Sequence, residues 1–228
     1  MTQTITIHSM RGGTGCSTIS ASLAKILACD GNKVGLIDLA LAAPNLHKLF
    51  SIPQNQFMFT LNDVQQGEAT IAEAVCTLEH GAGQIELLCA DGTLGALARN
   101  LRDAERPTRL NKLLEQFSAE KNLDYLILDT ATGITRESII GLAAADMVCM
   151  VTTVVDQQEV ALVKNLMGRI GNPALQMILN QVDPDNVEVR ESAEYLLIYT
   201  DVPAAAGCNL NLPQSFIDAL TATATVLA

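Results

Sequence analysis

The sequence predicts an α/β fold of three layers, in which helices cover both faces of a mostly parallel β-sheet. Short apolar strands alternate with helical segments along the chain, without an internal repeat or a low-complexity linker. A glycine-rich turn joins the first strand to the first helix, and three later strands end in acidic or amide side chains. We predict that residues 1–228 form a single domain, because 228 residues suffice for one substantial core.

The composition indicates a folded protein with an acidic surface. Hydrophobic residues make up 49% of the chain and charged residues 17%, which is typical of a buried core and not of a disordered chain. The net charge of −11 argues against non-specific DNA binding. One dense basic group occurs, and we interpret it as a solvated helix face that pairs with nearby acids: Arg99, Arg102, Arg106 and Arg109.

Several features predict a cytoplasmic protein without a membrane anchor. The first residues lack the basic region and cleavage site of a secretory signal, and no apolar run reaches transmembrane length. The segment Leu212–Ala228 carries Asp218 as its one charged side chain, so it would gain little at an anionic membrane. The six cysteines lack C-x-x-C spacing and are read as reduced thiols: Cys16, Cys29, Cys76, Cys89, Cys149 and Cys208.

The stretch from Ile5 to Ser20 predicts a phosphate-binding loop. It reads I-T-I-H-S-M-R-G-G-T-G-C-S-T-I-S, which is a strand, a glycine-rich turn and the start of a helix expected over Cys16–Cys29. Glycine lacks Cβ, so backbone amides there approach an anion closely, and the helix adds its positive dipole end. The alternative is a glycine-rich turn without a ligand.

One position of this loop departs from the P-loop pattern G-x-x-x-x-G-K-[ST]. Cys16 stands where that pattern has lysine, while Ser17 stands at the hydroxyl that ligates magnesium. Because the ammonium group is missing, we expect the loop to keep phosphate binding and to have weakened hydrolysis. A thiol at a helix N-terminus is also expected to have a lowered pKa and to be reactive. The alternative is that cysteine is a small residue that fits there.

The second strand, Lys33–Asp38, completes a βαβ unit and therefore implies a parallel sheet. Its terminal Asp38 is expected near a bound phosphate, because parallel strands place their carboxyl ends at one edge. The alternative is that Asp38 caps a turn or helix. Residues 39–84 are expected to contain helical pieces at 44–50 and within 61–75, and the next strand is 85–89.

The second half of the chain repeats this alternation. A leucine-rich helix over about 110–122 precedes the strand 124–129, whose terminal Asp129 stands where a magnesium-supporting acid is usual. The alternative is a helix cap. Further strands are expected at 147–151 and 175–183, separated by a helix over 157–169. Helices are expected near 187–195 and 214–222, with a loop at 201–204.

These landmarks resemble the MinD/ParA-type deviant Walker A P-loop ATPases of the SIMIBI class over nearly the whole chain. They are the loop R-G-G-T-G-C-S-T at 11–18, the strand ending in Asp38 with P-N-L after it, D-T-A-T-G at 129–133, and the strand ending in Asn180. The resemblance implies a three-layer P-loop NTPase fold, ATP or ADP with Mg²⁺ as ligands, an ATP-dependent homodimer and an unidentified protein partner.

The resemblance also implies roles for individual residues. Ser17 and Asp129 would hold magnesium, Asp38 would orient or activate the attacking water, and Asn180 would contact adenine. Arg11 replaces the family's signature lysine, which reaches across an ATP-sandwich dimer, and keeps its positive charge. The phosphates would be held by the rest of the loop: Gly12, Gly13, Thr14, Gly15, Cys16, Ser17 and Thr18.

Two departures from the family leave its activity open. Cys16 replaces the P-loop lysine, and Ala40 stands where the family often has a second acid. A loop that begins R-G-G and lacks the second lysine is most similar to the CpaE/TadZ branch. The chain is therefore expected to be an ATP-dependent dimeric switch that positions or assembles a cellular structure, with weak hydrolysis. A non-hydrolysing scaffold for pilus localisation and a metallocentre-insertion ATPase of the CooC type are the alternatives.

Overall fold

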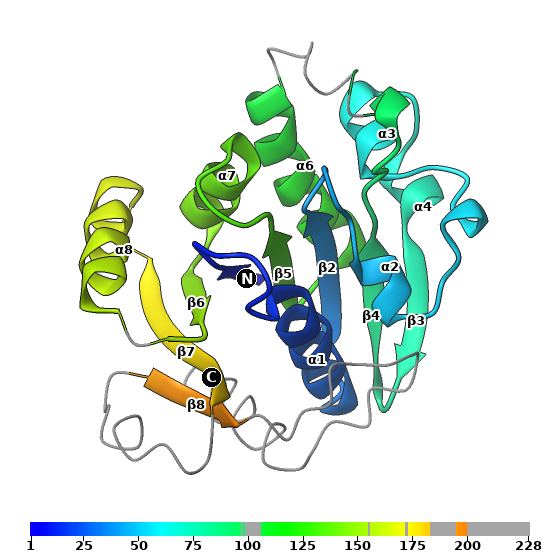
Figure 1. The fold of residues 1–228 in the computed structure, drawn as a ribbon. Coiled ribbons are helices and arrows are strands. Elements are labelled where there is room, and N and C mark those ends of the chain that lie inside the picture. Colours follow the sequence, from blue (N-terminus) through cyan, green and yellow to red (C-terminus); the bar gives the residue numbers. More distant parts are fainter. Residues whose placement is uncertain (97, 99–105, 155, 172, 183–194, 200–228) are drawn as a thin grey trace.

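The computed structural model describes residues 1–96, 98, 106–154, 156–171, 173–182 and 195–199. Its centre is an eight-stranded sheet in the order β3-β4-β2-β5-β1-β6-β7-β8 (Figure 1). All neighbouring strands are parallel except β3 and β4, which pair antiparallel at the edge. The strands are β1 Gln3–His8, β2 Lys33–Leu39, β3 Cys76–His80, β4 Gly83–Leu88, β5 Tyr125–Thr130, β6 Met147–Thr152, β7 Ala174–Val182 and β8 Tyr195–Tyr199.

Helices cover both faces of this sheet. They are α1 Cys16–Cys29, α2 Leu46–Leu49, α3 Leu61–Gln66, α4 Ile71–Ala74, α6 Arg106–Lys121, α7 Arg136–Ala144 and α8 Gln157–Arg169, with a short 3₁₀ turn at Gln54–Gln56. On one face α1 lies across the middle of the sheet, and on the other face α6 and α7 lie behind it (Figure 1). The predicted three-layer fold is therefore confirmed.

Alternating side chains of the central strands build a separate apolar core on each face. Ile5 and Ile7 of β1 pack with Leu23 of α1 in the first core. Ile37 of β2 packs with Phe117 of α6 in the second. A third cluster joins α8 to β6 and β7. Because the strands are parallel, their carboxyl ends and the loops that follow lie at one edge of the sheet.

Most predicted elements agree with the structure, and the helices predicted over 16–29 and 157–169 have the observed bounds. Strands β3 and β8 and helix α7 were not predicted. β3 is a short edge strand whose side chains are no more than half-buried, so it lacks a strong apolar pattern. α7 contains Gly141, which weakens helix propensity but lets the helix approach Thr130 of β5 closely.

Some predictions fall on parts of the chain outside the described residues. These are the helices near 187–195 and 214–222, the loop at 201–204, the segment Leu212–Ala228, Cys208, and the arginines at 99 and 102. Within the described ranges, no helix is long and apolar enough to cross a membrane. The five cysteines there are free thiols, as predicted: Cys16, Cys29, Cys76, Cys89 and Cys149.

Gly35 of β2 tests how tightly α6 packs on the sheet. A Cβ at this position would collide with Leu123 and would lie 2.9 Å from Cε1 of Phe117. We expect Gly35→Ala to lower the free energy of unfolding by about 1–3 kcal/mol, because it overpacks the core. Gly168→Ala in α8, where a Cβ meets nothing within 4 Å, is the control and should raise stability by up to about 1 kcal/mol. Urea titration of the three proteins measures both values, and an unchanged Gly35→Ala variant would contradict the packing.

Candidate functional site

The loop between β1 and α1 has the backbone conformation that its glycines predict. Gly13 and Gly15 have φ values of +77° and +91°, in the left-handed region that a side chain disfavours. Gly15 also caps the N-terminus of α1, and a Cβ there would strike the side-chain amide of Asn180. The chain therefore needs glycine at this point both for the turn and for the close approach of β7.

The backbone amides of this loop are available to an anion. None of the amide groups of residues 13–18 donates a hydrogen bond to another described residue. The N-terminus of α1 also has no side-chain cap. Several N–H donors and the positive end of the helix dipole thus converge on one place, which is the chemistry of a phosphate site. Phosphate binding by this loop stays a prediction, and these free amides are the groups that it requires.

These amides border a hollow of about 480 Å³, a size typical of small-ligand sites. Its described lining consists of glycines, alanines, hydroxyl side chains, one thiol and one amide, and none of these residues has a charged side chain. The lining residues are Gly13, Thr14, Gly15, Cys16, Ser17, Thr18, Ala40, Ala42, Ala43, Asn45, Thr130, Ala131 and Thr132.

Asp38 lies beneath the hollow and does not line it. Its side chain is fully buried, and its carboxylate accepts hydrogen bonds from the backbone amides of Ala40, Asn45 and Leu46 at 3.0, 2.9 and 3.1 Å. This is the capping arrangement that the sequence left as the alternative. Burial raises the pKa of Asp38, and the three amides oppose that rise. The role of Asp38 in activating water stays a prediction.

Asp129 stands beside Asp38, because the two residues are paired in register between β5 and β2. Its Oδ1 accepts a hydrogen bond from Oγ of Ser20 at 3.0 Å, whereas Oδ2 is buried without a hydrogen-bond partner in the described structure. Burial and the charge of Asp38 raise the pKa of Asp129 to about 8, and the hydroxyls of Ser17 and Ser20 oppose that rise. The fold thus brings Ser17 and Asp129 together, and the unsatisfied oxygen suits a divalent cation.

The expected lowered pKa of Cys16 is wrong. Burial raises the pKa of this thiol to about 12, because the charged thiolate would lose its hydration. The Sγ atom lies 3.5 Å from Oγ1 of Thr14, and the side chain packs against the apolar core under α1. The helix dipole does not overcome burial here, so Cys16 fits the alternative of a small packing residue.

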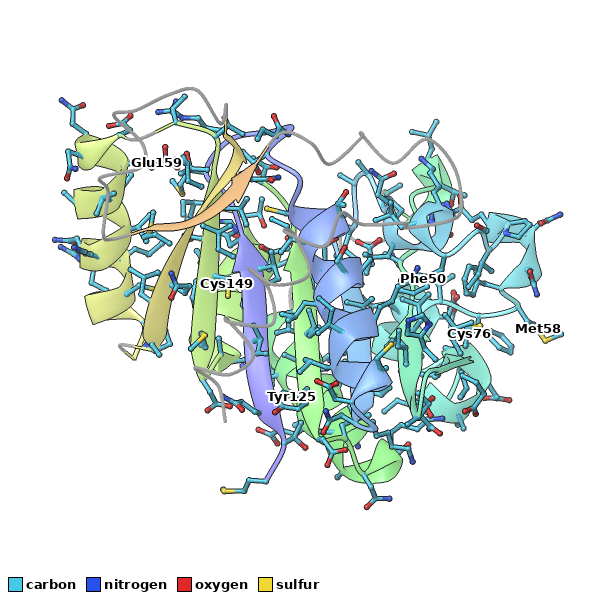
Figure 2. The ribbon with its side chains drawn as sticks, turned by 90° about the horizontal axis from the view of Figure 1, so that it is seen from below. Phe50, Met58, Cys76, Tyr125, Cys149 and Glu159 are labelled. Carbon is cyan, nitrogen blue, oxygen red and sulfur yellow. The ribbon has the colours of Figure 1, made fainter. Side chains whose placement is uncertain are left out.

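Arg11 points away from the hollow, toward the N-terminus of α8. Its guanidinium nitrogens lie 2.6 Å from Oδ2 of Asp156 and 3.2 Å from Oε2 of Glu159. Asp156 is also the N-cap of α8, and Glu159 lies near the start of that helix (Figure 2). The predicted contact of Arg11 across a dimer stays a prediction, since within this chain the cation has acidic partners of its own.

Asn180 and Gln181 hold the phosphate-binding loop from the side of β7. The amide nitrogen of Asn180 donates to the carbonyl of Thr14 at 2.8 Å, and that of Gln181 donates to the carbonyl of Gly13 at 3.1 Å. The predicted contact of Asn180 with adenine stays a prediction. Sequence reasoning missed Gln181, because one amide near the end of a strand carries no spacing signal.

Comparison with known proteins gives consistent matches. A family profile described as an AAA domain matches residues 2–177. The chain is 30% identical over 187 residues to an uncharacterised ATP-binding protein of Methanocaldococcus jannaschii, covering 81% of this chain and 66% of that protein. It is 32% identical over 153 residues to the flagellum site-determining protein YlxH of Helicobacter pylori, covering 67% of this chain and 48% of that protein. The matches thus span about half to two thirds of these relatives.

The fold is similar to a solved structure of the septum site-determining protein MinD from Pyrococcus horikoshii, complexed with Mg-ADP. The TM-score is 0.75, with 20% sequence identity, and the superposition covers 100% of this chain and 98% of that chain.

Asp129→Asn tests how the buried carboxylate of Asp129, next to Asp38, affects the stability of the folded chain. An acid whose pKa rises from 3.8 unfolded to about 8 folded binds a proton more tightly in the folded state, so stability falls as pH rises between these values. We expect the variant to be more stable than the parent at pH 8 and to lose less stability between pH 5 and 8. Asp30→Asn, which removes one exposed carboxylate, controls for net charge. Chemical denaturation across this pH range measures the effect, and parallel curves for parent and Asp129→Asn would contradict it.

Proposed function

The chain belongs to the MinD/ParA-type P-loop ATPases, and we propose that it is a cytoplasmic, nucleotide-binding member of that family with weak or absent hydrolysis. The bound nucleotide controls how the protein associates with a protein partner. The observation that carries this proposal is a set of loop amides that border the hollow and have no hydrogen-bond acceptor among the described residues. The described walls of the hollow have no charged side chains.

ATP or ADP with magnesium is the ligand that best fits this hollow. Backbone amides of a glycine-rich loop bind phosphate oxygens, and the Pyrococcus protein of similar fold was solved with Mg-ADP. Ser17 and Asp129 would hold the magnesium ion, which neutralises part of the phosphate charge when it is bound. The buried, unsatisfied Oδ2 of Asp129 supports this assignment.

Three features support slow or absent hydrolysis. Cys16 removes the P-loop ammonium, and the loss of one transition-state contact commonly costs on the order of a hundredfold or more in rate. Asp38 uses both carboxylate oxygens to hold the following loop. Ala40 lines the hollow with a methyl group, which offers no base to a water molecule. These features favour the non-hydrolysing scaffold over the hydrolysing switch.

The positioning or assembly of a cellular structure is the process we propose, by analogy with relatives such as the flagellum site-determining protein. A homodimer is the first partner to test. Ile134 and Val154, 51% and 45% exposed, lie in the loops that follow β5 and β6 at the edge that carries the hollow. We propose that these two side chains contribute to the dimer contact, because they are exposed and apolar and lie at this edge of the sheet.

Light scattering of the protein without nucleotide, with ADP and with ATP measures the homodimer. We expect a doubled mass with ATP and Mg²⁺, and loss of that doubling in the pair of charge substitutions Ile134→Asp and Val154→Asp. Leu94→Asp, an exposed leucine in the segment after β4, is the control and should leave the mass unchanged. A monomeric mass under all three conditions would contradict the homodimer and leave a different protein as the partner.

Titration calorimetry with Mg-nucleotide, run beside a phosphate-release assay on the same sample, tests the proposed function. We expect saturable binding at one site per chain and phosphate release near the background rate. Asp129→Asn should weaken the magnesium-dependent part of the affinity. Rapid phosphate release would contradict the scaffold and restore the hydrolysing switch, whereas the absence of any nucleotide binding would contradict the proposal as a whole.

A further inference from the structure

We propose that the hollow binds a nucleoside diphosphate in preference to the triphosphate. This inference rests on the proposed nucleotide binding and specifies which nucleotide the protein retains. It follows from the distribution of charge around the loop, where the positive groups reach the inner phosphates and no described side chain offers a cation to a terminal one.

The described groups of the protein that attract phosphate at this site carry partial charges and no full positive charge. The free amides of residues 13–18 and the N-terminus of α1 supply partial positive charge, equivalent to roughly half an elementary charge for the helix. This field acts within the first turn of the helix. In a phosphate-binding loop such amides cradle the α- and β-phosphates, and the loop lysine reaches the β- and γ-phosphates. Here Cys16 takes the place of that lysine, so the inner phosphates keep their donors and the outer one loses its cation.

The wall that faces the loop adds no cation among the described residues. Ala40, Ala42 and Ala43 line it with methyl groups. The backbone amide of Asn45 donates to Oδ2 of Asp38 at 2.9 Å, so this residue can offer the hollow only its neutral side-chain amide. A third phosphate beside this wall would meet methyl groups and neutral polar side chains but no charged partner, which is unfavourable for a charged group that leaves water.

The arginine of the loop is engaged elsewhere. Bringing Arg11 to a terminal phosphate would break its contacts with Asp156 and Glu159. The carboxylate of Glu159 is only 8% exposed, so it would lose the cation that faces it while remaining largely buried.

Competition calorimetry in Mg²⁺ tests the preference, with ADP compared with the non-hydrolysable triphosphate AMPPNP. We expect the parent protein to bind ADP at least tenfold more tightly than the triphosphate. Cys16→Lys should tighten triphosphate binding by at least tenfold relative to ADP, because it returns the missing cation. Cys29→Lys places the same charge at the exposed far end of α1 and should leave the ratio unchanged.

A second measurement needs no variant and repeats the comparison with inorganic pyrophosphate and tripolyphosphate as competitors of a fluorescent ADP. Tighter competition by pyrophosphate supports the inference. Equal or tighter binding of the triphosphates to the parent protein would overturn it and leave the proposed nucleotide binding intact. Failure of both ADP and AMPPNP to bind would instead overturn the proposed function, and the inference with it.

Discussion

The free backbone amides of residues 13–18 are the constraint on which the rest of the site depends. Buried or half-buried amide groups are costly without acceptors, so a loop that leaves several of them open must be held in place by other contacts. Asn180 and Gln181 hold its carbonyl groups from β7, and the amide of Gly133 donates to the carbonyl of Ser9 from the loop after β5. Neighbouring strands thus fix the loop through its carbonyl oxygens and leave its amides to the hollow.

The two buried acids at this edge, Asp38 and Asp129, differ in how many hydrogen bonds their carboxylates accept. Asp38 is satisfied by three backbone amides and in return fixes the 39–46 loop that forms one wall of the hollow. Asp129 keeps one oxygen without a partner in the described structure, and burial together with the charge of Asp38 raises its pKa. The buried carboxylate of Asp129 therefore lowers the stability of the folded chain. A cation bound beside Ser17 and Asp129 would restore that stability, because it would bind the folded state alone.

The sequence was sufficient for the features that local patterns and chain topology determine. Glycines 13 and 15 required a special turn, and acids at the ends of parallel strands had to meet at one edge. The direction of Arg11 could not be predicted, because its partner Asp156 lies 145 residues away. The pKa of Cys16 was predicted with the wrong sign, since the helix dipole is a local feature and burial is a property of the folded chain. Strand β3 was missed because an edge strand has few buried side chains to mark it.

Cys16, Ala40 and the pairing of Arg11 with α8 all bear on the same part of the proposed site. A chain that had lost only the lysine at position 16 would retain an acid near the terminal phosphate and a free cation at position 11. Here the wall carries Ala40, and Arg11 is paired with α8. On the proposed function, these three features would leave the outermost phosphate without a cation or an acid beside it, and the amides proposed to hold the inner phosphates would be unaffected. A ligand held in this way acts through binding energy alone, which adds about 2.7 kcal/mol to folding when its concentration is a hundred times its dissociation constant. On the proposed function, the nucleotide is then a structural ligand that fixes the loops at this edge for a partner.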